Sequence, residues 1–189
     1  MNVFYLDNDP KICAQMHADK HVVKMLVEYG QMMSTAHRVQ DGKAYLDKTR
    51  LGHKIRRWRL DDEREYILYK ASHINHPSNI WLRQSKENYM WLFVLWGYLH
   101  VEYEQRYGKQ HKGLELYPYV KNPPQFILLE GWSEPPLAMP DIYKIEGKTV
   151  ESYRNFYNKS KSRFATWKNE QPEWFRPLLS ESNVMEANT

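Results

Sequence analysis

The sequence predicts a mainly α-helical protein, a single-domain bundle around one central long helix at about residues 79–107, with a short N-terminal extended segment and a proline-rich loop. Apolar residues recur at helical spacing from Pro10 to Val39. The run from Tyr89 to Leu99 is apolar on every side of a helix, as expected of a helix at the centre of a fold. At 189 residues, with no low-complexity linker, the chain predicts one domain over residues 1–180 and a flexible tail over 181–189.

The N-terminal part of the chain predicts an extended segment and then a helix. Val3–Leu6 is a short apolar run without an evident partner strand, so we expect a strand or an extended arm. Asp9-Pro10 supplies an N-cap followed by proline at the first helical position, and Asp41-Gly42 ends the periodic pattern. We therefore predict one continuous helix between these signals.

The middle of the chain predicts a loop, two short helical segments and the long helix. Residues 43–60, KAYLDKTRLGHKIRRWRL, are basic and poorly periodic, and we interpret them as a loop followed by a short helix. A helical pattern over 61–72 ends at the turn 73–77, where Pro77 disfavours helical geometry in the preceding residue. We expect Ser78 to cap the long helix and Gly108 to end it.

The C-terminal part predicts a long loop and a last helix. Six prolines between Pro118 and Pro140 exclude a regular helix there and predict a proline-rich loop. The last helix should begin near Thr149 and lead into the basic segment 159–168, KSKSRFATWK.

The composition limits the class of protein. Cys13 is the single cysteine, which excludes a disulfide within the chain and a cysteine-based zinc cluster, and we interpret it as a packing residue. No leader pattern or run of about 18 apolar residues is present, so we predict a cytoplasmic protein with no membrane partner. The net charge of +4 and the pI near 9.0 weakly favour anionic partners, and the oligomeric state stays open.

A polar stripe on the first predicted helix is the main candidate site. Successive spacings of four, three, four and three residues place its members on one helix face. Two imidazoles beside a lysine suit phosphate binding or acid/base chemistry, whereas the alternative is a solvated face with an i, i+4 ion pair between Lys24 and Glu28. We assign His17, His21 and Glu28 as catalytic candidates and Lys24 and Gln31 as ligand-binding candidates.

Asp19 points away from this stripe. It lies about 200° from His17 on an ideal helix, so it cannot complete a His-x-Asp-x-His metal triad. We therefore predict no metal ligands and no cofactor, with a divalent ion at the histidine pair as the alternative. A carboxylate on an apolar face needs a cation, and Arg83, Arg38 or a histidine of the 73–77 turn is the expected partner.

Two further segments supply candidates for phosphate binding. The turn before the long helix contributes Asn75, His76 and Arg83, with local capping by Asn75 and Ser78 as the alternative. The glycine-bracketed segment 108–113, GKQHKG, contributes Lys109 and His111, with an exposed solvated loop as the alternative. Neither a P-loop nor a GxGxxG motif is present.

Two basic segments with aromatic residues have the composition of a nucleic-acid contact. Residues 54–59 and 159–168 combine cations that pair with phosphates and rings that stack on bases. In the alternative interpretation, Trp58 and Trp167 anchor the core and the cations extend around them.

Five segments carry a family resemblance: LDNDPKICAQMHADKHVVKMLVEYGQMMSTAHR, NHPSNIWLRQSKENYMW, RYGKQHKG, PPLAMPD and YRNFYNKSKSRFATWK. In them, over most of its length, the chain resembles a family of small helical proteins encoded by tailed phages. The resemblance implies a viral setting, in the cytoplasm of the host cell, where the usual ligands are nucleotides and nucleic acid. It implies no particular reaction.

Three functional hypotheses follow. The first is a nucleotide- or nucleic-acid-processing enzyme in which His17 or His21 is the general acid/base and Lys24, Arg83 and Lys109 bind phosphate. The second is a non-catalytic nucleotide-binding protein that sequesters a signal and so blunts host defence. The third is a basic DNA-binding accessory protein, whose affinity falls steeply with salt.

Overall fold

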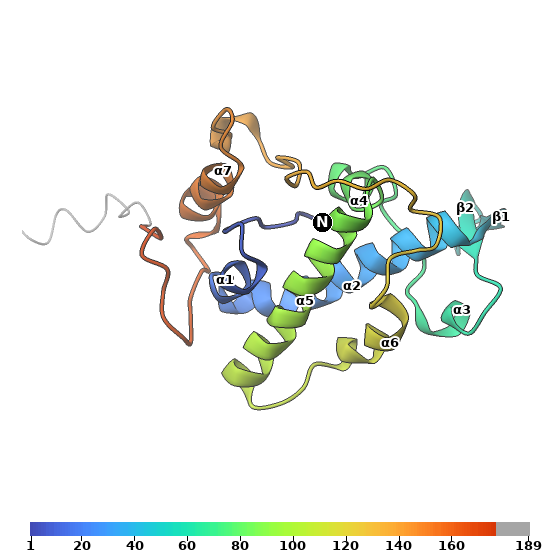
Figure 1. The fold of residues 1–189 in the computed structure, drawn as a ribbon, viewed down its shortest axis with the longest axis horizontal. Coiled ribbons are helices and arrows are strands. Elements are labelled where there is room, and N and C mark those ends of the chain that lie inside the picture. Colours follow the sequence, from blue (N-terminus) through green and yellow to red (C-terminus); the bar gives the residue numbers. More distant parts are fainter. Residues whose placement is uncertain (177–189) are drawn as a thin grey trace, which may run out of the picture.

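The computed structural model describes residues 1–176, which form a mainly helical fold with one two-stranded sheet (Figure 1). Its longest helices, α2 and α5, cross each other, and α5 also contacts α1 and α4. The predicted tail at 181–189 lies outside the described residues. The elements are α1 (Pro10–Gln15), α2 (Asp19–Asp41), β1 (Lys43–Lys48), β2 (Lys54–Arg59), α3 (Arg64–Ile67), α4 (Pro77–Leu82), α5 (Lys86–Tyr107), η1 (Lys112–Leu116), α6 (Tyr117–Val120), η2 (Asp141–Tyr143), α7 (Thr149–Phe156) and η3 (Tyr157–Lys161).

The first predicted helix is broken into α1 and α2. Asp9 caps α1 as expected, but Ala18 has extended backbone and α2 begins at the next residue. Side chains distant in sequence fill the hydrogen bonds lost at the break: Arg106 donates to the carbonyls of residues 15 and 17, and Trp167 to that of residue 16. The prediction of a continuous helix is therefore wrong, because tertiary donors satisfy the carbonyl groups that a helix would otherwise pair.

Residues 43–60 form a β-hairpin where the sequence predicted a loop and a short helix. The antiparallel strands pair from Lys43 opposite Arg59 to Lys48 opposite Lys54, and Gly52 in the connection has a φ of 82°. No residue of either strand is buried. The prediction was wrong because neither face is buried, so the alternation between buried and solvated residues that marks a strand is missing from the sequence.

The other helices follow the prediction in part. The pattern at 61–72 yields only α3, and the long helix is divided into α4 and α5. Ser85 caps α5 by accepting a hydrogen bond from the Asn88 N–H. Gly108, in the left-handed conformation at φ 68°, ends α5 as predicted. α7 begins at Thr149, also as predicted.

The core lies between α2, α5, α7 and the N-terminal segment. Trp96 of α5 donates its indole N–H to the Leu26 carbonyl of α2 at 2.9 Å, which fixes the crossing. Residues 3–6 are buried and belong to no strand, so the extended arm is the correct alternative. Cys13 packs against this N-terminal segment, with its thiol donating to the Phe4 carbonyl at 3.2 Å.

A long segment without regular helix follows α6, as the prolines predicted, and passes α4 on its way to α7 (Figure 1). The short α6 overlaps the start of the predicted loop, with Pro118 in its first turn, where proline is tolerated. Among the described helices, none has the length and apolar character that crossing a membrane requires.

Candidate nucleic-acid interface

The two predicted catalytic histidines lie in the core beneath the N-terminal segment. His17 is fully buried, and its Nδ1–H donates to the Cys13 carbonyl at 2.7 Å, which leaves Nε2 to accept from the Tyr29 hydroxyl at 3.5 Å. His21 is 4% exposed and contacts the Tyr157 hydroxyl through Nδ1. Burial lowers the pKa of His17 to about 4 and that of His21 to about 2, so both rings are neutral near neutral pH. The His17 ring links α1 to α2, and the His21 ring links α2 to Tyr157 of η3. Their acid/base role stays a prediction.

The other members of the predicted stripe lie nearer the surface of α2. Lys24 Nζ is 3.3 Å from Glu28 Oε1, the i, i+4 ion pair of the alternative interpretation. The Lys24 side chain is well exposed, and Gln31 is half-buried. Because the helix breaks before residue 19, His17 precedes α2, and the five residues do not lie on one continuous helix.

The candidates of the 73–83 turn have local contacts. His76, and not Ser78 or Asn75, caps α4, because its Nδ1 accepts from the Ser78 N–H at 3.2 Å. Arg83 donates to the Ile74 carbonyl at 2.7 Å and so closes the turn, while Asn75 is exposed. The predicted capping pair is therefore corrected to a single histidine cap.

Arg83 precedes the N-terminal end of α5, whereas Lys109 and His111 follow its C-terminal end. At 22 residues this helix is about 33 Å long. A single pocket that joins the 73–83 turn to the Lys109 loop is therefore not formed, whereas His76 of the turn lies close enough to Glu28 of α2 for the Glu28 charge to raise the His76 pKa against the lowering by burial.

Asp19 does pair with a cation, but with none of the expected ones. Arg106 Nη1 is 3.1 Å from Asp19 Oδ1, and Arg106 also pairs with Glu102 at 2.7 Å. The Arg106 side chain is 2% exposed. Its separation from Asp19 in the chain explains why the sequence did not reveal the pair.

One sizeable cavity includes none of the predicted site residues. It has a volume of about 690 Å³, lies between α1, α5 and residues 169–174, and is lined by Glu102, Arg154 and Trp174 among others. Within residues 1–176, no three side chains of His, Cys, Asp or Glu gather closely enough to share a metal ion.

The β1–β2 hairpin, residues 43–59, carries the densest positive charge and is here called the arm. In Figure 1 it lies at one end of the molecule, beyond the C-terminal end of α2. Asp47 is its single carboxylate. Its seven cationic side chains are those of Lys43, Lys48, Arg50, Lys54, Arg56, Arg57 and Arg59.

Several of these cations are free of protein partners. Lys43 pairs with Asp61 and Arg57 with Asp47, and the Arg59 guanidinium lies 5.4 Å from the centre of the Tyr45 ring. Among the described residues, the remaining arm cations, Lys48, Arg50, Lys54 and Arg56, form no ion pair.

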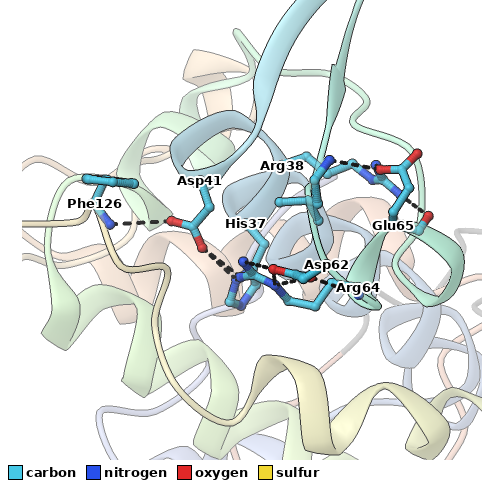
Figure 2. A network of polar contacts seen from close by, with 8 residues as sticks. His37, Arg38, Asp41, Asp62, Arg64, Glu65 and Phe126 are labelled. Atoms are coloured by element: carbon cyan, nitrogen blue, oxygen red, sulfur yellow. Dashed lines mark hydrogen bonds and ion pairs between the residues drawn. The ribbon is translucent and has the colours of Figure 1, made fainter.

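Arg38 fixes the base of the arm to α2 (Figure 2). Its buried guanidinium donates to the Trp58 carbonyl of β2 at 3.1 Å and to the Glu65 carboxylate at 2.6 Å. It also donates to the carbonyls of Tyr69, Glu65 and Leu68. The guanidinium thus holds β2 and the segment after it against one helix.

A second arginine completes the network at this base (Figure 2). Arg64 donates to Asp41 at 2.6 Å and to His37 Nδ1 at 2.9 Å, so the His37 Nε2–H donates onward to the Tyr89 hydroxyl at 2.9 Å. Burial would raise the pKa of Asp41, but the hydrogen bond from Arg64 and the charge of its guanidinium lower it. Arg64 also pairs with Asp62. Arg38 and Arg64 thus neutralise the carboxylates of Asp41, Asp62 and Glu65, which leaves the four unpaired cations of the arm uncancelled.

The sequence predicted part of the arm as a candidate contact. Residues 54–59 were recognised as a basic-aromatic segment, and Trp58 is half-buried at the base of the arm. The cations of β1 and the turn were missed. The signal that could have revealed them is Gly52 between two six-residue basic segments, a spacing typical of a hairpin.

Comparison of the chain with models of known protein families, with curated proteins and with solved structures gives no match.

Proposed function

We propose that this protein binds nucleic acid through the arm. The observation that carries the proposal is a two-stranded ribbon with seven cations and one carboxylate, exposed on both faces. Phosphates of nucleic acid attract such charge, and the major groove of DNA, about 12 Å wide, admits a two-stranded β-ribbon. The proposal corresponds to the third hypothesis drawn from the sequence.

The strand pairing supports an anionic partner. Lys48 lies directly opposite Lys54, and Lys43 opposite Arg59. Like charges in directly opposed positions destabilise a sheet. A bound phosphate relieves this repulsion, so the arm gains stability from its ligand.

The surroundings of His17 and His21 support an enzyme less than the arm supports nucleic-acid binding. His17 and His21 are buried and bonded to core groups, and Arg83 and Lys109 lie at opposite ends of α5. Catalysis, a nucleotide ligand, a phage origin and a cytoplasmic location stay predictions from the sequence, as does the bundle around a central helix. A phage origin would agree with a nucleic-acid ligand.

The test is a binding assay with matched charge variants. Fluorescence anisotropy of a labelled DNA duplex is measured over a series of salt concentrations for wild type, for Lys54→Gln/Arg56→Gln on the arm, and for Lys11→Gln/Lys20→Gln at the other end of the molecule. Both double variants remove the same net charge. If each arm cation contacts one phosphate, the arm variant lowers the slope of log K against log salt by about two and weakens binding by at least about tenfold.

The control variant should keep the wild-type slope. Equal effects of the two double variants would show that only net charge matters and would refute binding through the arm. Absence of binding to duplex and to single-stranded DNA and RNA at low salt would refute the proposed function as a whole.

A further inference from the structure

A cavity of about 400 Å³ lies beside the base of the arm. It is formed by residues 66–69, which follow the arm, and by residues 111–116, which follow α5. A second hollow shares Tyr66 with it and is also lined by Arg59 of β2 and by the carboxylates Asp61, Asp62 and Glu65, which pair with Lys43, Arg64 and Arg38. Because Tyr66 lines both, the first cavity is next to the base of the arm, within reach of a nucleic acid bound along the hairpin.

Aromatic side chains give this cavity faces on which a planar group can stack. Tyr66 is 89% exposed, more than any other large hydrophobic side chain of the described residues. Tyr69 also lines the cavity, and its backbone carbonyl is held by Arg38 at 2.7 Å. An anchored tyrosine and an exposed one provide a stacking platform for a base.

Polar groups of the cavity match the hydrogen-bonding edge of a nucleobase. His111 Nδ1 accepts from the Gly113 N–H at 3.0 Å, so Nε2 carries the hydrogen and can donate to a ligand. Burial lowers the pKa of His111, which keeps the ring neutral. Glu115 supplies an acceptor, and the exposed Lys112 supplies a cation.

We propose that this cavity, between Tyr66 and His111, receives an unpaired nucleobase of the nucleic acid that the arm binds. The inference rests on the proposed function. Stacking rings, one donor and one acceptor fit a base better than a free phosphate, which the Glu115 carboxylate would repel. The volume lies within the range of about 300–1,000 Å³ that is usual for small-molecule sites.

The test compares two duplexes that differ by one unpaired base. The first is fully paired, and the second has the same paired sequence with one extrahelical purine. Fluorescence anisotropy should show that wild type binds the second duplex about tenfold more tightly, because stacking on one aromatic side chain contributes about 5-fold to 150-fold. Tyr66→Ala should abolish this difference and leave the affinity for the paired duplex unchanged, whereas Tyr66→Phe should keep it.

The matched control is Tyr98→Ala, which removes a partly exposed tyrosine from α5 and should keep the preference. A fluorescent purine analogue at the unpaired position gives a second readout, since stacking on Tyr66 quenches it. Wild type that binds both duplexes equally would refute the base site and leave the arm proposal intact. A Tyr66→Ala variant that loses affinity for both duplexes equally would also refute it. Binding of neither duplex would overturn the proposed function first.

Discussion

Replacing Arg38 by methionine should destabilise the protein by about 3 to 5 kcal/mol, the usual range for breaking a buried ion pair. The Arg38 side chain is 3% exposed and donates four hydrogen bonds to backbone carbonyls and one to the Glu65 carboxylate. Methionine keeps much of the aliphatic length but supplies no donor. Each carbonyl left unpaired costs about 1 kcal/mol and the bond to the carboxylate about 2 kcal/mol. Water that reaches the part-buried groups, including the 28% exposed Glu65, reduces this total.

Urea unfolding followed by circular dichroism measures the change, and Arg57→Met is the control. Arg57 also pairs with one carboxylate, Asp47 at 2.8 Å, but the two side chains are 22% and 40% exposed. Such surface pairs contribute about 0–1 kcal/mol. Hydrogen exchange at the β2 amides should be faster in Arg38→Met because the arm opens locally. If Arg38→Met costs no more than Arg57→Met, the reasoning that Arg38 anchors the arm is wrong.

Three further outcomes are expected from single measurements. Stability in urea should fall as the pH falls from about 6.5 to about 4, because burial lowers the pKa of His17 and His100 to about 4 and of His21 to about 2, so that the unfolded chain binds protons first. His17 alone contributes about 3 kcal/mol to this loss, and a flat profile over that range would contradict the burial of neutral histidines. Gly97→Ala should raise the melting temperature, since the added methyl group meets open space inside α5 and alanine stabilises a helix by about 1 kcal/mol relative to glycine. Gly52→Ala should lower it, because the φ of 82° in the hairpin turn strains any residue with a Cβ, and an unchanged melting temperature would place the turn in another conformation.

The elements that the sequence predicted correctly are those with local signals. Asp9 caps α1 and Gly108 ends α5, each by an interaction with residues a few positions away, and α7 begins at Thr149. Helical periodicity also located most of α2 and α5, because each buries one or more faces against the core. Such features are fixed by propensity and by burial, both of which are visible in a single sequence.

The elements that were missed depend on distant residues. Residues 16–18 show no helix breaker, and the break is specified by Arg106 and Trp167, which supply donors from elsewhere in the chain. The same holds for Asp19, because the sequence does not show which of the chain's many cations, in fact Arg106, lies beside it in the fold. The arm was missed for another reason. It buries neither face, so its strands lack the alternation of apolar and polar residues that predicts a strand.

The candidate site follows the same division. The assumption of one continuous helix placed His17 on the same helix as Lys24, whereas the break puts it before α2. Positive charge is a property of composition, so the basic segment at 54–59 was identified without knowledge of the fold. That His111 and Tyr66 line one cavity depends on how α5 directs the chain back toward the arm, which only the structure shows.

The break between α1 and α2 has a consequence for the order of folding during synthesis. The groups that stabilise it, Arg106, Thr166 and Trp167, leave the ribosome long after residues 10–41. Until then the emerging segment has only its local helical pattern, which favours one uninterrupted helix. The contacts that set the break can therefore form only once the C-terminal segment has been synthesised. Closing contacts so far apart in the chain is slow, so this step is expected to limit the rate at which the native fold is reached.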